Sequence, residues 1–433
     1  MYHFEDILIA LIFILAHFLL FLFNYRVYGK KILHPAVLFS LIWFIIIALH
    51  WFFSFTVLNE LPPLRISTYL IFFIGAISFS LGSYTETAVQ KKYFVNQNLN
   101  YASLDNSEIN LKVIYVLLGI ALIGLPFFLI ASYKIFIASN VDSFFIGLRS
   151  ELLYGDADIG VLKYLFPFSL VVYSFSLRNS LINKNRINKI LLFVSFLLTL
   201  TYAVFTTGRL IFLIILVVYL GMRFIYGKNF SVKTVLRFAF FFMLVFIGLG
   251  IVYKKGGTSE ETFRNNVNPA IEGTAIYMVV SLNALDKKLH NQFRVNYDGN
   301  NTFRFFIKLG KEFGLFHQAK VNDLIPPFTF TPYPTNVYTI YSSYIEDYGY
   351  FYAWFIMALL GFLQSFLFNK AIRTWDLRYS FYYSILLYPL LISFFADQYF
   401  SLISFWVQFA VIVEVIILLN KFFNKRKLKF SIS

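Results

Sequence analysis

The chain has 433 residues, of which 59% are hydrophobic and 21% aromatic but only 14% charged, and its formal net charge at pH 7 is +15. Soluble domains carry about 25% charged residues, so this composition excludes an ordinary soluble domain and indicates a membrane protein. The basic residues lie dispersed beside apolar runs, which favours membrane topology over nucleic-acid binding. Cysteine is absent, so neither a disulfide framework nor a thiolate metal site is expected.

Apolar runs of about 20 residues, enough to cross a bilayer as a helix, recur along the whole chain. The first run follows no basic segment and precedes no small-residue cleavage pattern, so we interpret it as a retained span. We predict an all-α polytopic membrane protein with residues 1–433 in a single integral membrane domain. The expected spans, about eleven, cover roughly 5–23, 35–57, 66–84, 113–132, 161–177, 190–206, 210–226, 235–253, 351–369, 379–396 and 401–420.

The distribution of lysine and arginine between alternate loops predicts the orientation of these spans. One set of loops, with the C-terminal tail, holds about 22 such residues, and the short loops of the other set hold four or five. Because cytoplasmic loops carry the excess of positive charge, we expect the N-terminus outside and the C-terminus inside.

The longest polar segment, about 254–350, is also predicted to be extracytoplasmic, since long loops translocate largely regardless of charge. A structureless connection of this length would be unusual, so we expect it to have structure and function of its own. We predict a helix over 270–289 and an amphipathic stretch over 303–316 that lies in the outer headgroup layer. The polar face of that stretch carries Arg304, Lys308 and Lys311.

A tight turn, Thr206-Thr207-Gly208-Arg209, connects two of the apolar runs at the outer face. Gly208 is expected to supply a permissive backbone, and Arg209 falls in the first turn of the next helix. A helix N-terminus already carries partial positive charge, so a bound phosphate or carboxylate would explain an arginine there. The alternative is an arginine that extends its head group to water at the membrane edge.

Several other polar features allow more than one interpretation. Asp156-Ala157-Asp158 resembles the paired-aspartate metal site of nucleotide-sugar transferases, but nucleotide sugars are not available on its predicted outer side. His290 and His317 are either general bases or solvated loop residues. For Glu414, in the last span, we favour a structural hydrogen bond to a neighbouring helix over a functional role.

The outward-facing aromatic and basic residues also allow two interpretations each. The tyrosines between Tyr333 and Tyr352 form either an interfacial belt or a surface that stacks on sugar rings. The outward cations either cluster around a pyrophosphate or contact anionic lipid headgroups. The sequence contains no Gly-rich phosphate loop, paired-histidine metal motif or GxSxG turn, so hydrolase and nucleotidase functions lack support.

Residues from about 200 to 370 resemble a known family. The features are the Thr-Gly-Arg turn, the long outer loop with its helix over 270–289, and the run Thr335-Asn336-Val337-Tyr338-Thr339 followed by Tyr344-Ile-Glu-Asp347-Tyr-Gly349. Together they resemble the oligosaccharide repeat-unit polymerases, the Wzy-type O-antigen and capsule polymerases of bacterial inner membranes. Outside this region the resemblance rests on span count and hydropathy.

The resemblance implies a multi-pass enzyme of the bacterial cytoplasmic membrane, with a bundle similar to GT-C glycosyltransferases and an outward catalytic cleft. Such an enzyme moves a growing glycan from undecaprenyl pyrophosphate onto a hydroxyl of the next lipid-linked unit. It implies no nucleotide, metal or other cofactor and no nucleic-acid partner. The implied partners are the lipid-linked oligosaccharide, membrane lipids, a flippase and a chain-length regulator.

The family motif points to Arg209 as a site residue, and the other candidates are chosen from their chemistry. Arg209 would stabilise the charge that accumulates on the pyrophosphate, and Glu272 or Asp347 would accept the hydroxyl proton. The candidate substrate-binding residues are Gly208, Arg264, Arg294, Asn336 and Tyr338, with the choice between the two arginines open.

Two rival functions remain. A ligase of the same architecture would pass finished glycan to a different acceptor. A transporter or flippase of lipid-linked oligosaccharide should line its interior with cations deep in the spans, whereas nearly every cation here lies at a span end. This distribution favours the enzyme.

Overall fold

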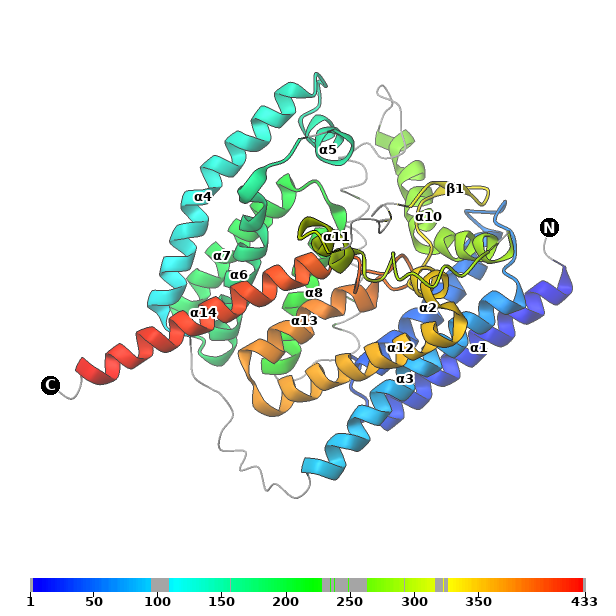
Figure 1. Ribbon diagram of the computed structural model, residues 1–433, viewed down its shortest axis with the longest axis horizontal. Helices are drawn as coiled ribbons and strands as arrows, with labels where there is room; N and C mark the ends of the chain where they lie inside the picture. Colours follow the sequence, from blue (N-terminus) through cyan, green and yellow to red (C-terminus); the bar gives the residue numbers. More distant parts are fainter. Residues whose placement is uncertain are drawn as a thin grey trace. The chain divides into compact units, whose positions relative to one another are not determined.

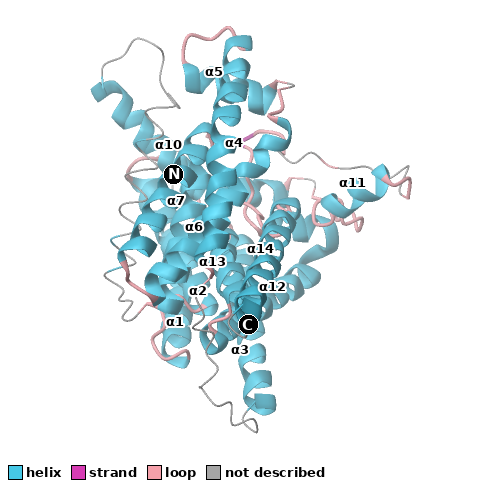
Figure 2. Ribbon diagram, turned by 90° about the vertical axis from the view of Figure 1, so that its left-hand side faces the viewer, coloured by secondary structure: helices cyan, strands magenta, loops and turns pink. Residues whose placement is uncertain are grey.

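A computed structural model describes residues 3–94, 109–155, 157–227, 263–291, 293–315 and 326–430, and the single residues 234, 237, 248 and 322. Its regular structure is almost entirely helical (Figures 1 and 2). The chain divides into two compact units. Unit 1 comprises residues 1–100, 261–369 and 386–403, and unit 2 comprises 101–260, 370–385 and 404–433.

Unit 1 is built from six helices and one short antiparallel hairpin. These are α1 (Phe4–Val27), α2 (Pro35–Phe55), α3 (Ile66–Phe94), α10 (Phe263–His290), α11 (Arg304–Glu312), most of α12 (Tyr341–Thr374), β1 (Thr329–Phe330) and β2 (Pro334–Thr335).

Unit 2 is helical throughout its described residues. Its elements are α4 (Leu111–Ala138), α5 (Phe144–Tyr154), the 3₁₀ turn η2 (Gly160–Tyr164), α6 (Leu165–Ile182), α7 (Arg186–Phe205), α8 (Arg209–Tyr226), most of α13 (Leu377–Leu391) and α14 (Ile403–Phe430).

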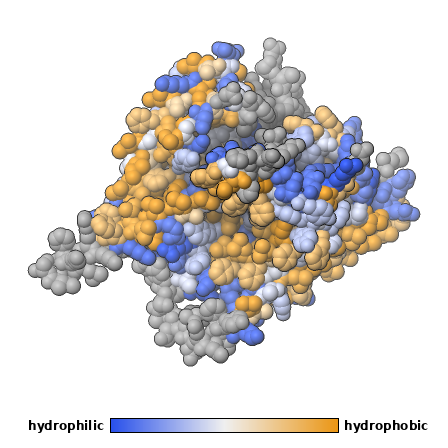
Figure 3. Space-filling view, viewed as in Figure 1, coloured by the Kyte–Doolittle hydropathy of each residue, from blue (hydrophilic) through white to orange (hydrophobic). Residues whose placement is uncertain are grey.

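Nine candidate spans within the described part of the chain are long and apolar enough to cross a membrane. Space-filling colours show wide hydrophobic areas over helices such as α4 (Figure 3). The chain is therefore an all-α, multi-pass membrane protein, as its composition predicts. The expected span at 235–253 lies almost wholly outside the described residues.

The expected span 379–396 is longer than the helix that the structure forms there. Helix α13 has only 15 residues and ends at Leu391. The chain beyond it leaves the helix because its carbonyls bond to another segment: the amide of Thr339 donates to Phe395 O (3.1 Å) and that of Ile340 to Ser393 O (2.8 Å). Thr339 and Ala396 thereby form an isolated parallel β-bridge.

Buried polar side chains connect the first three helices of unit 1. The amide of Asn24 on α1 donates to Ser40 Oγ on α2 (3.2 Å) and to Ser80 Oγ on α3 (2.9 Å). Both serines donate in turn to a carbonyl of their own helix. A polar group in an apolar bundle requires such partners, so this network fixes how α1, α2 and α3 meet.

Helices α3 and α12 cross at a pair of glycines. A Cβ atom at Gly82 would overlap the carbonyl oxygen of Ala358, and one at Gly361 would overlap that of Phe79. Ser83 Oγ donates to Gly361 O across the contact (3.1 Å). The two backbones approach this closely only because both positions lack a side chain.

Helix α10 contains the expected 270–289 helix but begins earlier, at Phe263. Its Ala275, Val279 and Val280 form a buried cluster with Leu58 and Leu61 of the segment after α2, and Leu49 and Phe53 of α2 pack against this cluster. The segment after α2 is fastened to α10 by polar contacts as well. Asn283 donates to Pro62 O (2.7 Å), and Asp286 accepts from the Arg65 amide (3.2 Å).

Three loops predicted on the outer side thus meet in unit 1. Residues 58–65 bond to α10, and Ser281 on α10 donates to Phe394 O in the loop after α13 (2.6 Å). The long 254–350 segment contributes α10 itself.

In unit 2, Glu414 bonds to a neighbouring helix, as its structural interpretation predicts. Its Oε1 lies 3.2 Å from Arg378 Nε and 3.3 Å from Tyr382 OH, both on α13. Arg178 is also held by aromatic groups, since its Nε donates to Tyr226 OH (3.0 Å) and its guanidinium lies over that ring. Asp158 pairs with Lys163 in an exposed turn, and Asp156 lies outside the described residues.

The glycine crossing gives the first prediction. Gly361→Ala and Gly82→Ala should each destabilise the protein by about 1–3 kcal/mol, because the added methyl forces the backbones of α3 and α12 apart. Thermal unfolding of the detergent-purified protein measures the effect.

Gly119→Ala is the matched control. Gly119 lies inside α4 with nothing within 4 Å of its Cβ position. Alanine there should leave stability unchanged or raise it by about 0.5–1 kcal/mol. Equal unfolding temperatures for all three variants and the parent chain would refute the close crossing.

Candidate functional site

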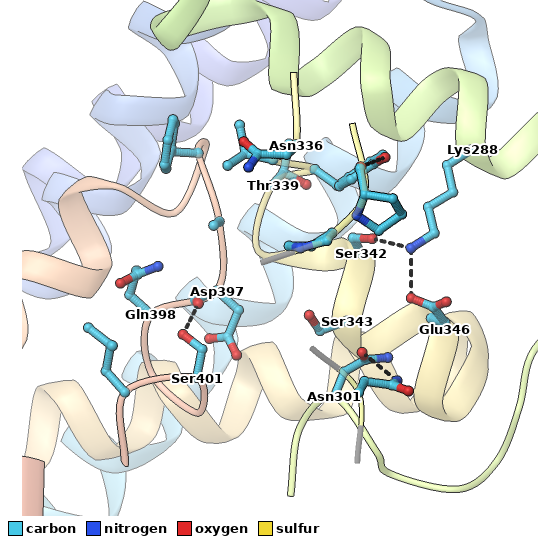
Figure 4. Close-up of a pocket in the computed structure, with 18 residues that line it drawn as sticks. Lys288, Asn301, Asn336, Thr339, Ser342, Ser343, Glu346, Asp397, Gln398 and Ser401 are labelled. Atoms are coloured by element: carbon cyan, nitrogen blue, oxygen red, sulfur yellow. Dashed lines mark hydrogen bonds and ion pairs between the residues drawn. The ribbon is translucent and has the colours of Figure 1, made fainter. Parts of the chain in front are cut away.

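Unit 1 contains a polar cavity of about 610 Å³ between α10, the start of α12 and the loop after α13 (Figure 4). This volume falls within the range of small-molecule sites, about 300–1,000 Å³. A second cavity, of about 310 Å³, shares part of its lining. The polar residues that line the first are Lys288, Asn301, Asn322, Asn336, Tyr338, Thr339, Ser342, Ser343, Glu346, Asp397, Gln398 and Ser401.

A break inside α12 sets one wall of the cavity. Gly349 has φ 79° and ψ 176°, so α12 is two helical segments that join at this residue. This backbone region is essentially restricted to glycine. The short first segment carries Ser342, Ser343 and Glu346 at spacings that place them on one side of the helix, and all three line the cavity.

Lys288, near the end of α10, is fully engaged at one side of the cavity. Its Nζ lies 2.7 Å from Glu346 Oε2, 3.2 Å from Ser342 Oγ and 4.9 Å from the centre of the Tyr338 ring. The Lys288 and Glu346 side chains are both partly buried, at 29% and 24% exposure. The hydroxyl of Tyr338 donates to Pro327 O (3.1 Å), which holds the ring beside the ammonium.

Asp397 lies at the opposite side of the cavity, in the loop after α13 (Figure 4). Its Oδ1 accepts from Tyr344 OH (2.8 Å) and from the amides of Tyr399 (2.9 Å) and Phe400 (3.3 Å). Burial raises the pKa of Asp397 to about 6, although these hydrogen bonds oppose the shift. A carboxyl group that titrates near neutral pH is suited to general acid–base chemistry.

The structure brings two predicted site residues, Asn336 and Tyr338, into this cavity. Asp347 lies close by and has a structural task. Its carboxylate accepts from the amide of Thr302 (2.7 Å), from the Asn301 side chain (2.8 Å) and from the Asn301 amide. Asn301 lines the cavity and accepts from Asn322 Nδ2 (2.9 Å), so Asp347 holds the cavity rim in place.

Two other predicted residues lie outside this lining, and the side chain of a third is not described. Glu272 is exposed on α10, and Arg294 is exposed in the segment that follows it. Arg264 belongs to α10, but its side chain lies outside the described part of the structure, as does His317. The catalytic role of Glu272 therefore stays a prediction that the described cavity does not support.

Arg209 begins α8 in unit 2 and is buried, with 9% of its surface exposed. Burial disfavours the alternative in which its head group simply extends to water. The turn before it differs from expectation, because the left-handed residue is Thr207 (φ 55°) and not Gly208 (φ −91°). Arg149 on α5 stabilises this turn by donating from Nη1 to Thr207 O (2.7 Å).

Sequence reasoning missed Lys288 as a site residue. Lys287 and Lys288 occur in the last turn of α10, where cations are ordinary because they complement the helix dipole. Glu346 and Asp397 lie near the ends of expected spans, where acidic residues are ordinary because water is close. Glu346 and Asp397 come together because of the Thr339–Ala396 bridge, which no local pattern in the sequence predicts.

We compared the chain with protein-family models, with curated proteins and with solved structures, and found no match in any of the three comparisons.

The Asp347 contacts give the second prediction. Asp347→Ala should loosen the 299–302 turn, because it leaves the buried amides of Asn301 and Thr302 without their acceptor. The expected cost is about 1–3 kcal/mol. Limited proteolysis with mass spectrometry should show faster cleavage around 299–302.

Glu312→Gln, an exposed change on α11, serves as the control and should leave the cleavage rate unchanged. If Asp347→Ala keeps the parental cleavage pattern yet abolishes function, Asp347 acts on substrate and not on the turn.

Proposed function

We propose that this chain polymerises undecaprenyl-pyrophosphate-linked oligosaccharide repeat units into surface polysaccharide on the outer face of the bacterial cytoplasmic membrane. The observation that carries the proposal is a polar cavity that holds a carboxyl group with a near-neutral pKa. The cavity is built from loops predicted on the outer side. One of its walls is formed by the Thr335–Gly349 region, which also carries the family resemblance.

The proposed reaction transfers a glycan between two lipid-linked substrates. A hydroxyl oxygen of the acceptor unit forms a bond to the anomeric carbon of the donor glycan. The bond between that carbon and the diphosphate oxygen breaks, and the lipid diphosphate leaves with the electron pair. The hydroxyl proton passes to a base on the protein. The leaving group is already good, so the protein mainly positions the acceptor and stabilises charge.

Asp397 is the residue best placed to act as that base. Its carboxylate lies in the cavity, and Tyr344 with two backbone amides fixes its orientation. Glu346 is less suitable because Lys288 pairs with it at 2.7 Å. The structure thus shifts our choice of base from Glu272 and Asp347 to Asp397.

Arg209 remains our candidate for contact with the diphosphate. Its support is local to unit 2: a buried arginine in the first turn of α8, where helix N–H groups also favour an anion. The proposal treats this residue and the cavity separately, and each has its own test.

The Asp397 test uses the purified full chain in nanodiscs with its lipid-linked repeat unit. Asp397→Asn should lower the polymerisation rate by about 10²–10⁴-fold, the usual contribution of a positioned base. In the parent chain the rate should rise with pH through about 6, because only the deprotonated carboxylate accepts the proton. An unperturbed aspartate would instead place this transition near 4.

Glu312→Gln provides the control and should keep both the rate and the pH dependence. The proposal for Asp397 fails if the asparagine variant polymerises at the parental rate, or if the parent rate is flat between about pH 5 and 7.

The Arg209 test is made in the native host, with surface polysaccharide resolved on gels. Arg209→Ala should remove the long-chain ladder while single repeat units are still delivered, because the diphosphate loses its cationic partner. Arg209→Lys should restore little of the ladder, since a lysine lacks the bidentate geometry for phosphate.

The outcome also separates the rival functions. If no lipid-linked unit reaches the outer face in either variant, a flippase is favoured. If the polymer forms but is not passed to its final acceptor, a ligase is favoured. A ladder of unchanged length in both variants would exclude Arg209 from the reaction.

A further inference from the structure

Acidic groups outnumber basic groups in the described lining of the cavity. Its described lining carries one ammonium group, on Lys288, and two carboxyl groups, on Glu346 and Asp397. At pH 7 the formal sum is +1 − 2 = −1. A diphosphate carries negative charge of its own, so the charges of the described lining disfavour it.

The single cation is also occupied. Glu346 Oε2 and Ser342 Oγ take hydrogen bonds from Lys288 Nζ, and the Tyr338 ring lies beside it. Phosphate sites in proteins present cations and N–H groups toward the anion. Here the Lys288 ammonium is already neutralised by a carboxylate at 2.7 Å.

The rest of the polar lining is neutral and rich in groups that both donate and accept. Asn336, Gln398 and Ser343 supply amides and a hydroxyl. Asn301, Asn322, Ser342 and Ser401 add further polar groups that already make hydrogen bonds within the protein. Amides and hydroxyls can match the alternating donors and acceptors of a polyhydroxylated ring, and the Tyr338 ring offers an apolar face. This chemistry suits a sugar.

We infer that the cavity binds the sugar portion of a substrate, neutral or amino-bearing, and that Glu346 excludes the diphosphate by neutralising Lys288. The inference deepens the proposed function and rests on it for the identity of the excluded group. Glu346 is thereby a specificity-determining residue of the cavity. The bound sugar is then that of the acceptor unit, whose hydroxyl meets Asp397, and the donor's diphosphate stays outside the described lining.

The experiment measures binding to the full chain in nanodiscs by calorimetry at constant ionic strength. The probes are maltotriose, chitotriose, a glucosamine trisaccharide and inorganic pyrophosphate. At least one trisaccharide should bind, and Asn336→Ala should weaken it about tenfold, equivalent to 1.4 kcal/mol. Pyrophosphate should not compete with that trisaccharide in the parent chain.

Glu346→Gln makes the decisive variant. It leaves Lys288 without its carboxylate, so pyrophosphate should now compete with the bound trisaccharide, with an affinity at least about tenfold above that of the parent chain. Replacing Lys288 by Gln in the same background should abolish the gained competition. Glu312→Gln should behave as the parent chain, and thermal unfolding confirms that each variant is folded.

The inference is overturned if no trisaccharide binds, if pyrophosphate competes in the parent chain, or if Glu346→Gln gains no competition. These results are distinct from failure of the proposed function. If the binding pattern is as stated but Asp397→Asn still polymerises at the parental rate, the cavity is a sugar site in a protein with another activity. If Asp397→Asn is inactive but pyrophosphate occupies the parent cavity, the polymerase function is supported and the assignment of the cavity to a sugar is wrong.

Discussion

The cavity depends on one backbone interaction, the pairing of the 339–340 segment with the loop that follows α13. The amides of Thr339 and Ile340 donate to the carbonyls of Phe395 and Ser393, just beyond the end of α13 at Leu391. The same pairing brings Asp397 opposite the first segment of α12.

Several independent constraints then fix the side chains. Gly349 breaks α12 with a backbone conformation that other residues rarely adopt, so Glu346 and Ser342 face α10 and meet Lys288. Asp347, one residue after Glu346, points to the other side and secures the turn that carries Asn301. Two adjacent acidic residues of this sequence motif therefore have different roles. Glu346 lines the cavity, and Asp347 supports the rim of the cavity.

Much of the fold was predictable because a membrane demands long apolar runs. The approximate ranges of α1, α2, α4 and α7 follow from hydropathy, and the helix around 270–289 follows from the helical spacing of its apolar residues. The failures have a common cause in tertiary hydrogen bonding. In the apolar 379–396 run, the carbonyls of Ser393 and Phe395 accept hydrogen bonds from the amides of Ile340 and Thr339, so the regular helix stops before the run ends.

The site was predictable only in part for the same reason. Asn336 and Tyr338 belong to a motif that resembles a known family, and both line the cavity. Lys288 resembled an ordinary C-terminal helix cation, and the pKa of Asp397 depends on burial that only the folded chain creates. The local sequence shows which residue types are present, but it does not show which of them lie close together in the folded chain.

The central claim is that Asp397 contacts the lipid-linked substrate in the cavity. Carbodiimide labelling of membranes that contain the full chain, followed by mass spectrometry of the peptide that carries Asp397, tests it most directly. We expect Asp397 to be labelled in the absence of substrate and protected when the lipid-linked repeat unit is added. Equal labelling with and without a repeat unit that the same membranes polymerise would contradict the account.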